Sequence, residues 1–181
     1  ASAPVVLQFG DGKPTYGGTP SDHTVVQVCA ALRARGLKVM LYPMIFVDTI
    51  TPEAKPWRGR IIPTSTTDVT NFFTSSTGYN AFINHYANLN VGGVLLKNNI
   101  DGFMIGSELV GLTQYMSSAG VFPAVTQLKS LAASVKTAVG SGVKVMYGGD
   151  WSEYHSVNGW YNLDPLWSDA NIDAVAIDCY V

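Results

Sequence analysis

The chain has 181 residues, of which 47% are hydrophobic and only 13% are charged, so it can bury a full-sized core and is not a disordered segment. A formal charge of -2 without any basic block argues against a phosphate-binding surface, so nucleic acid is not expected as a partner. No apolar run approaches the ~20 residues that a membrane-spanning helix needs. We expect one domain over residues 1–181, cut from a longer protein, because the first residues resemble neither a translation start nor a signal peptide.

Cysteine and histidine give no sign of a metal site or a cofactor. Cys29 and Cys179 are too few for a disulfide framework, and we expect both to be buried thiols. The three histidines are scattered along the chain without the spacing that zinc ligands show. We therefore expect no metal and no cofactor.

The first half of the chain predicts a strand, a helix and a second strand. Residues 5–9 form a short apolar run, and Ser21 is a suitable N-cap for a helix that ends near Gly36. Residues 37–47 are almost continuously apolar, as in a parallel strand covered on both faces, with Pro43 marking its end or a bulge. Residues 48–67 are expected to be an irregular loop, the longest in the chain.

The second half continues the alternation of helices and strands. The expected elements are helices over 78–96 and 123–140 and strands over 100–106, 143–147 and 172–181. The small-residue segment 64–77 is expected to be a loop leading into a helix, and 150–170 a loop rich in Trp and Tyr. Such alternation implies parallel pairing, in a barrel or in an open doubly wound sheet.

Two observations favour the barrel. No strand is followed by a glycine-rich loop of the dinucleotide-binding or nucleotide-binding type. Acidic residues gather at the carboxyl ends of the expected strands, where barrel enzymes keep their catalytic groups. They are Asp48, Glu108, Asp150 and Asp178.

Glu108 is the most informative single residue. It follows the strand over 100–106, so its carboxyl should emerge at the C-terminal mouth of the sheet. The alternative is that Ser107 or Glu108 caps a helix beginning at Leu109, where free N–H groups favour a carboxylate.

The segment 150–155 adds two carboxylates, two aromatic rings and an imidazole at the same rim. Glycosidic cleavage needs one acid to protonate the departing oxygen and a second carboxylate to attack or to activate water, and Glu108 with Glu153 is a conceivable pair. The alternative is a surface loop in which Asp150 and Glu153 bond to nearby backbone amides, while Trp151 merely packs.

Aromatic and arginine side chains could complete a binding surface. The residues that could form flat platforms for sugar rings are Trp57, Trp151, Trp160, Trp167, Tyr42, Tyr154 and Tyr180, although we expect half of them to serve packing. Arg58 and Arg60 either bind a carboxylate or clamp the long loop onto the rim. Serine and cysteine hydrolases are excluded, because no Gly-x-Ser-x-Gly turn occurs and both cysteines lie within expected elements.

Several ordered motifs share one explanation. They are Tyr-Gly-Gly-Thr-Pro-Ser-Asp at 16–22, Pro-Trp-Arg-Gly-Arg-Ile at 56–61, Ile-Gly-Ser-Glu-Leu at 105–109, Asp-Trp-Ser-Glu-Tyr at 150–154, Leu-Asp-Pro-Leu-Trp at 163–167 and Ile-Asp-Ala-Val-Ala-Ile-Asp at 172–178. Together they resemble the TIM-barrel-like, glycoside-hydrolase-like domain of the baseplate-hub tail proteins of gene transfer agents and related tailed phages. The resemblance covers nearly the whole chain.

The resemblance implies an incomplete (β/α)8 TIM-barrel-like α/β fold that contains about strands two to six. A complete barrel takes about 250 residues, so strands one, seven and eight would be missing. By similarity to retaining glycoside hydrolases, Glu108 matches the acid/base at the end of strand four. The nucleophile would lie beyond Val181, and Glu153, on strand five, is not its equivalent. Ser107 stands where those relatives usually carry an Asn that contacts the sugar.

The function implied is binding or cleavage of a cell-envelope polysaccharide or peptidoglycan-like glycan by the tail tip of a phage-like particle made in the host cytoplasm. Partners would be that glycan and other tail or baseplate proteins. Glu108 would be catalytic, and substrate contacts would come from Asp48, Trp57, Arg60, Ser107, Asp150, Trp151, Glu153 and Tyr180. As a general acid, Glu108 would need a raised pKa. The alternatives are a non-catalytic structural or glycan-binding barrel and, more remotely, a cytoplasmic oligosaccharide hydrolase.

Overall fold

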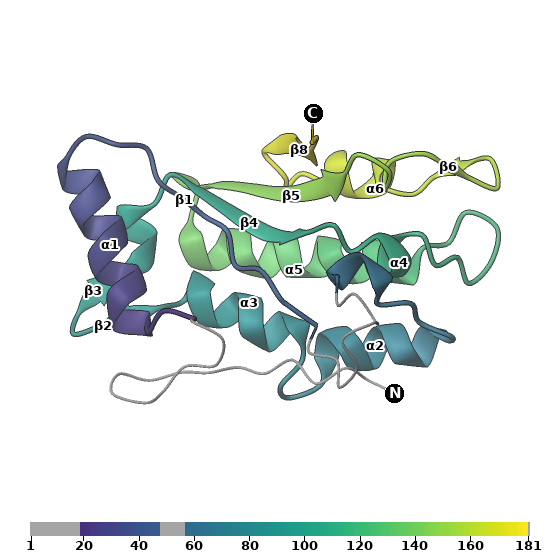
Figure 1. The fold of residues 1–181 in the computed structure, drawn as a ribbon, viewed down its shortest axis with the longest axis horizontal. Helices are drawn as coiled ribbons and strands as arrows, with labels where there is room; N and C mark the ends of the chain where they lie inside the picture. Colours follow the sequence, from purple (N-terminus) through teal and green to yellow (C-terminus); the bar gives the residue numbers. More distant parts are fainter. Residues whose placement is uncertain (1–18, 48–56, 181) are drawn as a thin grey trace.

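The computed structural model describes residues 19–47 and 57–180, which form a parallel sheet backed by helices (Figure 1). The four strands of the sheet lie in the order β1 (Met40–Leu41), β4 (Gly102–Ser107), β5 (Lys144–Asp150) and β8 (Ala174–Asp178), and every neighbouring pair is parallel. This confirms the expected incomplete TIM-barrel-like α/β fold. The described residues form no closed barrel.

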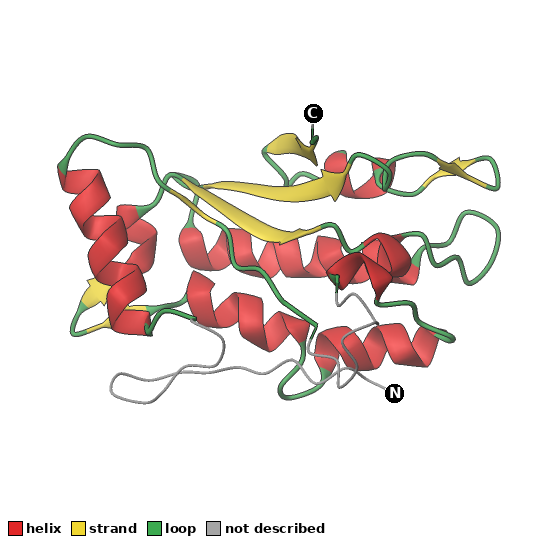
Figure 2. Cartoon of the chain, viewed as in Figure 1, coloured by secondary structure: helices red, strands yellow, loops and turns green. Residues whose placement is uncertain are grey.

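Helices cover one face of this sheet, as Figure 2 shows. The long helix α5 (Pro123–Val139) packs against β4 and β5, and α2 (Thr66–Thr74) and α3 (Tyr79–Ala87) pack against α5 in turn. Helix α1 (Asp22–Ala34) lies at one end of the layer against the 3-10 helix η4 (Leu96–Asn99). A hairpin joins antiparallel strands only. The chain must therefore cross back over the sheet between two parallel strands, and a helix usually forms this crossover.

The two faces of the sheet have different chemistry. Phe103 and Ile105 of β4 and Val145 and Tyr147 of β5 belong to the buried apolar core beneath the helices. On the other face, Met104 packs beside Gly148, and Ser107 and Asp178 follow it toward the carboxyl ends of the strands. The core therefore fixes the strands from the helical side and leaves the other face for polar groups.

Two expected elements are shorter than predicted. Only Met40–Leu41 of the run 37–47 forms a strand, because Pro43 lacks the N–H that would continue the ladder. The helix expected over 78–96 ends at Ala87 and gives way to the hairpin of β2 (Asn90–Val91) and β3 (Val94–Leu95). Gly92 and Gly93, with φ of 59° and 86°, make its turn, which requires positive φ at both central residues.

The segment 64–77 was expected to be a loop but contains α2. Ser65 caps this helix by accepting a hydrogen bond from the backbone N–H of Asp68. Val69, Phe72 and Phe73 then form its buried face. The prediction was wrong because small polar residues mark the start of this helix as well as a loop, and the apolar spacing of these three residues was missed.

The connections after β4 and β5 hold short elements. β4 leads into α4 (Val110–Thr113), and β5 leads into a hairpin of β6 (Ser156–Val157) and β7 (Trp160–Tyr161) followed by α6 (Asp164–Trp167). The expected loop 150–170 is thus partly regular. The residue preceding α4 is Leu109, which makes no side-chain capping bond, so capping by Ser107 or Glu108 was the wrong alternative.

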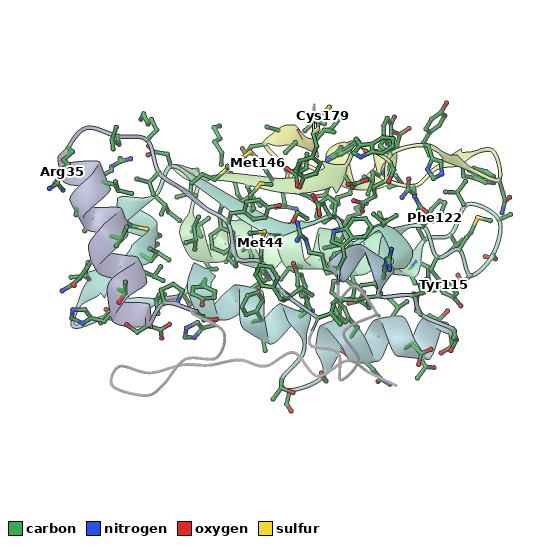
Figure 3. All side chains as sticks on the ribbon, viewed as in Figure 1. Arg35, Met44, Tyr115, Phe122, Met146 and Cys179 are labelled. Atoms are coloured by element: carbon green, nitrogen blue, oxygen red, sulfur yellow. The ribbon has the colours of Figure 1, made fainter. Side chains whose placement is uncertain are left out.

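The two cysteines differ. Cys29 is buried in α1, as predicted, whereas Cys179 is exposed just after β8 (Figure 3). The prediction for Cys179 was wrong because β8 is the outermost strand of the described sheet, with little packed against it. The strand expected over 5–9 lies outside the described residues. Among the described helices, none is long and apolar enough to cross a membrane.

Candidate functional site

The carboxyl ends of the parallel strands bring three acidic side chains to one edge of the sheet. Glu108 directly follows β4, Asp150 ends β5 and Asp178 ends β8. The strand register pairs Ser107 with Gly148 and Asp150 with Asp178, so these ends are level with one another. This edge is where parallel α/β proteins bind their ligands.

Glu108 is the centre of the site. Its residue is 3% exposed, and its carboxylate accepts two hydrogen bonds and forms an ion pair. Trp57 Nε1 donates to Oε2 at 2.8 Å, the Arg58 guanidinium lies 2.9 Å from the same oxygen, and the Tyr180 hydroxyl donates to Oε1 at 2.6 Å. Both oxygens are therefore bonded, and a buried cation balances the charge.

Arg58 reaches this carboxylate from the 3-10 helix η3 (Arg58–Arg60), which belongs to the loop between β1 and α2. Its Nε also donates to the backbone carbonyl of Ser107 at 3.0 Å and to the Ser107 hydroxyl at 3.2 Å. The side chains of Arg58 and Glu108 are 10% and 4% exposed, so the ion pair is nearly dry. Arg58 thus both binds a carboxylate and clamps its loop onto the sheet, while Arg60 is exposed.

The pKa of Glu108 lies below its usual value. Burial opposes its ionisation, but the hydrogen bonds from Tyr180 and Trp57 and the charge of Arg58 outweigh burial. Glu108 is therefore ionised at neutral pH in this structure. That is the reverse of the raised pKa expected for a general acid.

Asp178 behaves oppositely, although it shares a hydrogen bond with Glu108. Its pKa is raised, first by burial and then by the negative charge of Glu108, while a hydrogen bond from the Tyr42 hydroxyl at 3.0 Å works against the rise. A negative charge beside a carboxyl group disfavours its ionisation, so the group without a close cation has the raised pKa. Glu108 and Asp178 are thus neighbouring carboxyl groups with opposite pKa shifts.

Tyr180 is 73% exposed, yet its hydroxyl is held by the buried carboxylate. The hydrogen bond to Glu108 and the charge of Glu108 raise the pKa of Tyr180 to about 12. It therefore remains a donor over the whole physiological pH range. Trp57, 36% exposed, likewise presents part of its ring at the surface while its N–H points inward.

Glu153 does not reach the edge of the sheet. It is 0% exposed, and its Oε1 accepts from the Thr113 hydroxyl at 2.6 Å and the Tyr147 hydroxyl at 2.7 Å. Its Oε2 accepts from the backbone N–H of Asp150 at 3.0 Å. Burial is the main reason that the pKa of Glu153 is raised to about 7. A ligand at the carboxyl ends of the strands would not touch this side chain.

The other residues expected to contact a substrate differ in their exposure. Ser107 is 2% exposed and bonded to Arg58, and Asp150 is 5% exposed and bonded to the backbone N–H and hydroxyl of Ser152. Trp151 is 66% exposed and so is open to a ligand. Asp48 lies outside the described residues.

Three residues complete the site that the sequence named only as candidates for the rim, and not among the expected substrate contacts. Arg58, Tyr42 and Asp178 each lie one hydrogen bond or one ion pair from Glu108 or from each other. The position of Asp178 at a strand end was a usable signal. Nothing in the sequence distinguished Arg58 from Arg60, because their spacing does not show which one faces the sheet.

In the described part of the chain, no group of three or more His, Cys, Asp or Glu side chains is placed so that it could hold a metal ion.

Comparison with known proteins adds one finding. A family model described as the GTA TIM-barrel-like domain, where GTA denotes gene transfer agents, matches residues 77–181. This match covers more than half of the chain and includes Glu108, Asp150, Asp178 and Tyr180. No curated protein and no solved structure matches the chain significantly.

Proposed function

The chain belongs to the GTA TIM-barrel-like domain family and thus to the proteins of phage-like particles, and on that premise we propose that it binds a cell-envelope glycan at the carboxyl ends of β4, β5 and β8. The binding would occur at the tail tip, next to other tail or baseplate proteins, when the particle contacts a host. The observation that carries this proposal is the ionised Glu108 set between partly exposed aromatic rings.

The chemistry of that surface suits a sugar. A pyranose ring presents C–H groups on its faces and hydroxyl groups at its rim, and it stacks on aromatic rings while its hydroxyls bond to carboxylates and amides. Trp57, Trp151 and Tyr180 offer exposed ring surface at the site. A carboxylate behind the rings whose pKa is lowered fits binding better than proton donation.

Glycan cleavage is the second candidate, with Glu108 as acid/base. It is favoured by the position of Glu108 at the end of β4 and by the opposed pKa shifts of Glu108 and Asp178, since such pairs mark acid/base sites. It requires Glu108 to hold a proton. It also requires a facing carboxylate about 5 to 5.5 Å away, which by similarity to retaining glycoside hydrolases would lie beyond Val181.

Binding can be tested by calorimetry of the full chain with soluble peptidoglycan fragments and with purified capsular polysaccharide. We expect Trp57→Ala to weaken binding about tenfold, because one aromatic platform is lost. Tyr161→Ala is the matched control, since Tyr161 is 52% exposed but lies on β7. Absence of binding to both glycans, or equal loss in both variants, would contradict the proposal.

The same glycans separate binding from cleavage. The binding proposal predicts that the full-length tail protein releases no reducing ends from these glycans. It does not require that Glu108→Gln still binds them. Release of reducing ends that Glu108→Gln abolishes would instead establish the second candidate.

A further inference from the structure

Glu108 has an unusual backbone. Its φ is 50°, in the left-handed region, and Asn158 is the only other non-glycine residue with positive φ among those described. A non-glycine residue in that region is strained, and such strain persists only where surrounding contacts hold it. The contacts that hold this turn therefore control where the Glu108 carboxylate points.

Both peptide N–H groups at the turn are anchored to β5. The N–H of Glu108 donates to the carbonyl of Gly148 at 2.9 Å. The next N–H, of Leu109, donates to the side-chain hydroxyl of Tyr147 at 3.0 Å. The first contact continues the pairing of parallel strands, whereas the second depends on one buried side chain.

Tyr147 is held in place by Glu153. Its hydroxyl accepts from Leu109 and donates to Glu153 Oε1 at 2.7 Å, and both side chains are 0% exposed. Thr113 from α4 and the backbone of Asp150 donate to the same carboxyl. A continuous chain of hydrogen bonds thus joins the core behind β5 to the turn that carries Glu108.

We propose that Tyr147 and Glu153 are positioning residues, which hold the left-handed turn at Glu108 and so aim its carboxylate at Trp57, Arg58 and Tyr180. The importance of this positioning for ligand binding rests on the proposed function. The geometry itself can be tested without any ligand. It also accounts for the burial of Glu153, an acidic side chain whose described hydrogen bonds include none from a basic side chain.

The arrangement makes the site sensitive to pH. Protonation of Glu153, whose pKa is about 7, turns one acceptor position of the carboxyl into an O–H donor and removes its charge, so the hydrogen bonds from Thr113, Tyr147 and Asp150 weaken. The groups facing Glu153 are Tyr147 and Asp150 of β5 and Thr113 of α4. Gln114 of α4 bonds to the backbone carbonyl of Glu153 and to His155, which is the nearby imidazole.

The indole N–H of Trp57 reports on the Glu108 carboxylate, because the two are hydrogen-bonded at 2.8 Å. Proton–nitrogen NMR of the full chain, with the signal assigned by Trp57→Phe, follows it from pH 5 to 9. We expect one step with a midpoint near pH 7. Tyr147→Phe and Glu153→Gln should abolish the step and move the signal toward its position in Glu108→Gln.

Tyr79→Phe is the matched control. Tyr79 is also buried and its hydroxyl also bonds to β4, but to the carbonyl of Ile105 at 3.1 Å, so the step should remain. A step that survives Glu153→Gln and vanishes in His155→Gln would overturn the proposal. So would an unchanged Trp57 signal in folded Tyr147→Phe and Glu153→Gln proteins. If glycan binding fails while these shifts occur, only the proposed function is lost.

Discussion

Two buried glutamates, Glu108 and Glu153, lie on either side of the same turn and have opposite pKa shifts. Each is at most 3% exposed; Glu108 accepts two hydrogen bonds and forms an ion pair with Arg58, whereas Glu153 accepts three hydrogen bonds. Burial opposes the ionisation of both. At Glu108 the hydrogen bonds from Tyr180 and Trp57 and the charge of Arg58 outweigh burial, whereas at Glu153 burial outweighs the hydrogen bonds, the negative Asp150 adds to it, and the pKa is about 7. Low exposure alone therefore does not decide the pKa of a carboxyl group; its hydrogen bonds and charged neighbours act together with burial.

The largest expected effect comes from removing that cation. Arg58→Ala leaves the buried charge of Glu108 without its cation, and we expect the free energy of unfolding at pH 7 to fall by about 3–5 kcal/mol. Arg60→Ala, two residues away and exposed, is the control and should stay within about 0.5 kcal/mol of the parent. Chemical denaturation measures both; similar losses would show that Glu108 does not depend on Arg58.

The next effect is the pH dependence that Glu153 imposes. Its pKa is about 7 in the folded chain and near 4.5 when unfolded, so the folded state binds more protons between these values. The contribution of Glu153 to stability should therefore be largest below pH 4.5 and fall by up to about 3 kcal/mol as pH rises to 7. Denaturation of the parent and of Glu153→Gln at several pH values measures it, because the stability of the parent relative to the variant should fall by this amount; a difference that does not change with pH would contradict it.

A smaller effect is expected at the exposed end of the site. Tyr180→Phe removes one donor to Glu108, so the pKa of Glu108 should rise and the midpoint of denaturation at pH 7 should fall slightly. Carbon NMR of the Glu108 carboxyl measures this titration. Tyr154→Phe removes a hydroxyl that bonds to Asp164 and should leave it unaltered. A Glu108 pKa that stays low in Tyr180→Phe would assign the shift to Trp57 and Arg58 alone.

The sequence predicted the alternation of helices and strands where apolar periodicity was long and uninterrupted. Helix α5 and strands β4 and β5 lie close to their expected ranges, because each carries a largely buried face or run. Strand β8 also forms within its expected range, but most of it is exposed, so the expectation of a buried strand there was wrong. It failed where short-range signals decide, as at the glycine pair 92–93 and at the capped start of α2. A short helix or hairpin depends on two or three residues, and a pattern of that length has several structural solutions.

By itself the sequence determined that Glu108 follows a buried parallel strand and therefore lies at the carboxyl edge of the sheet. It also carried the motifs that mark the family. Only the tertiary structure decided which arginine faces Glu108, that Asp178 shares a hydrogen bond with it, and that Glu153 lies in the core. These contacts join residues up to 72 positions apart, so they depend on how the loops fold over the sheet and not on any local pattern.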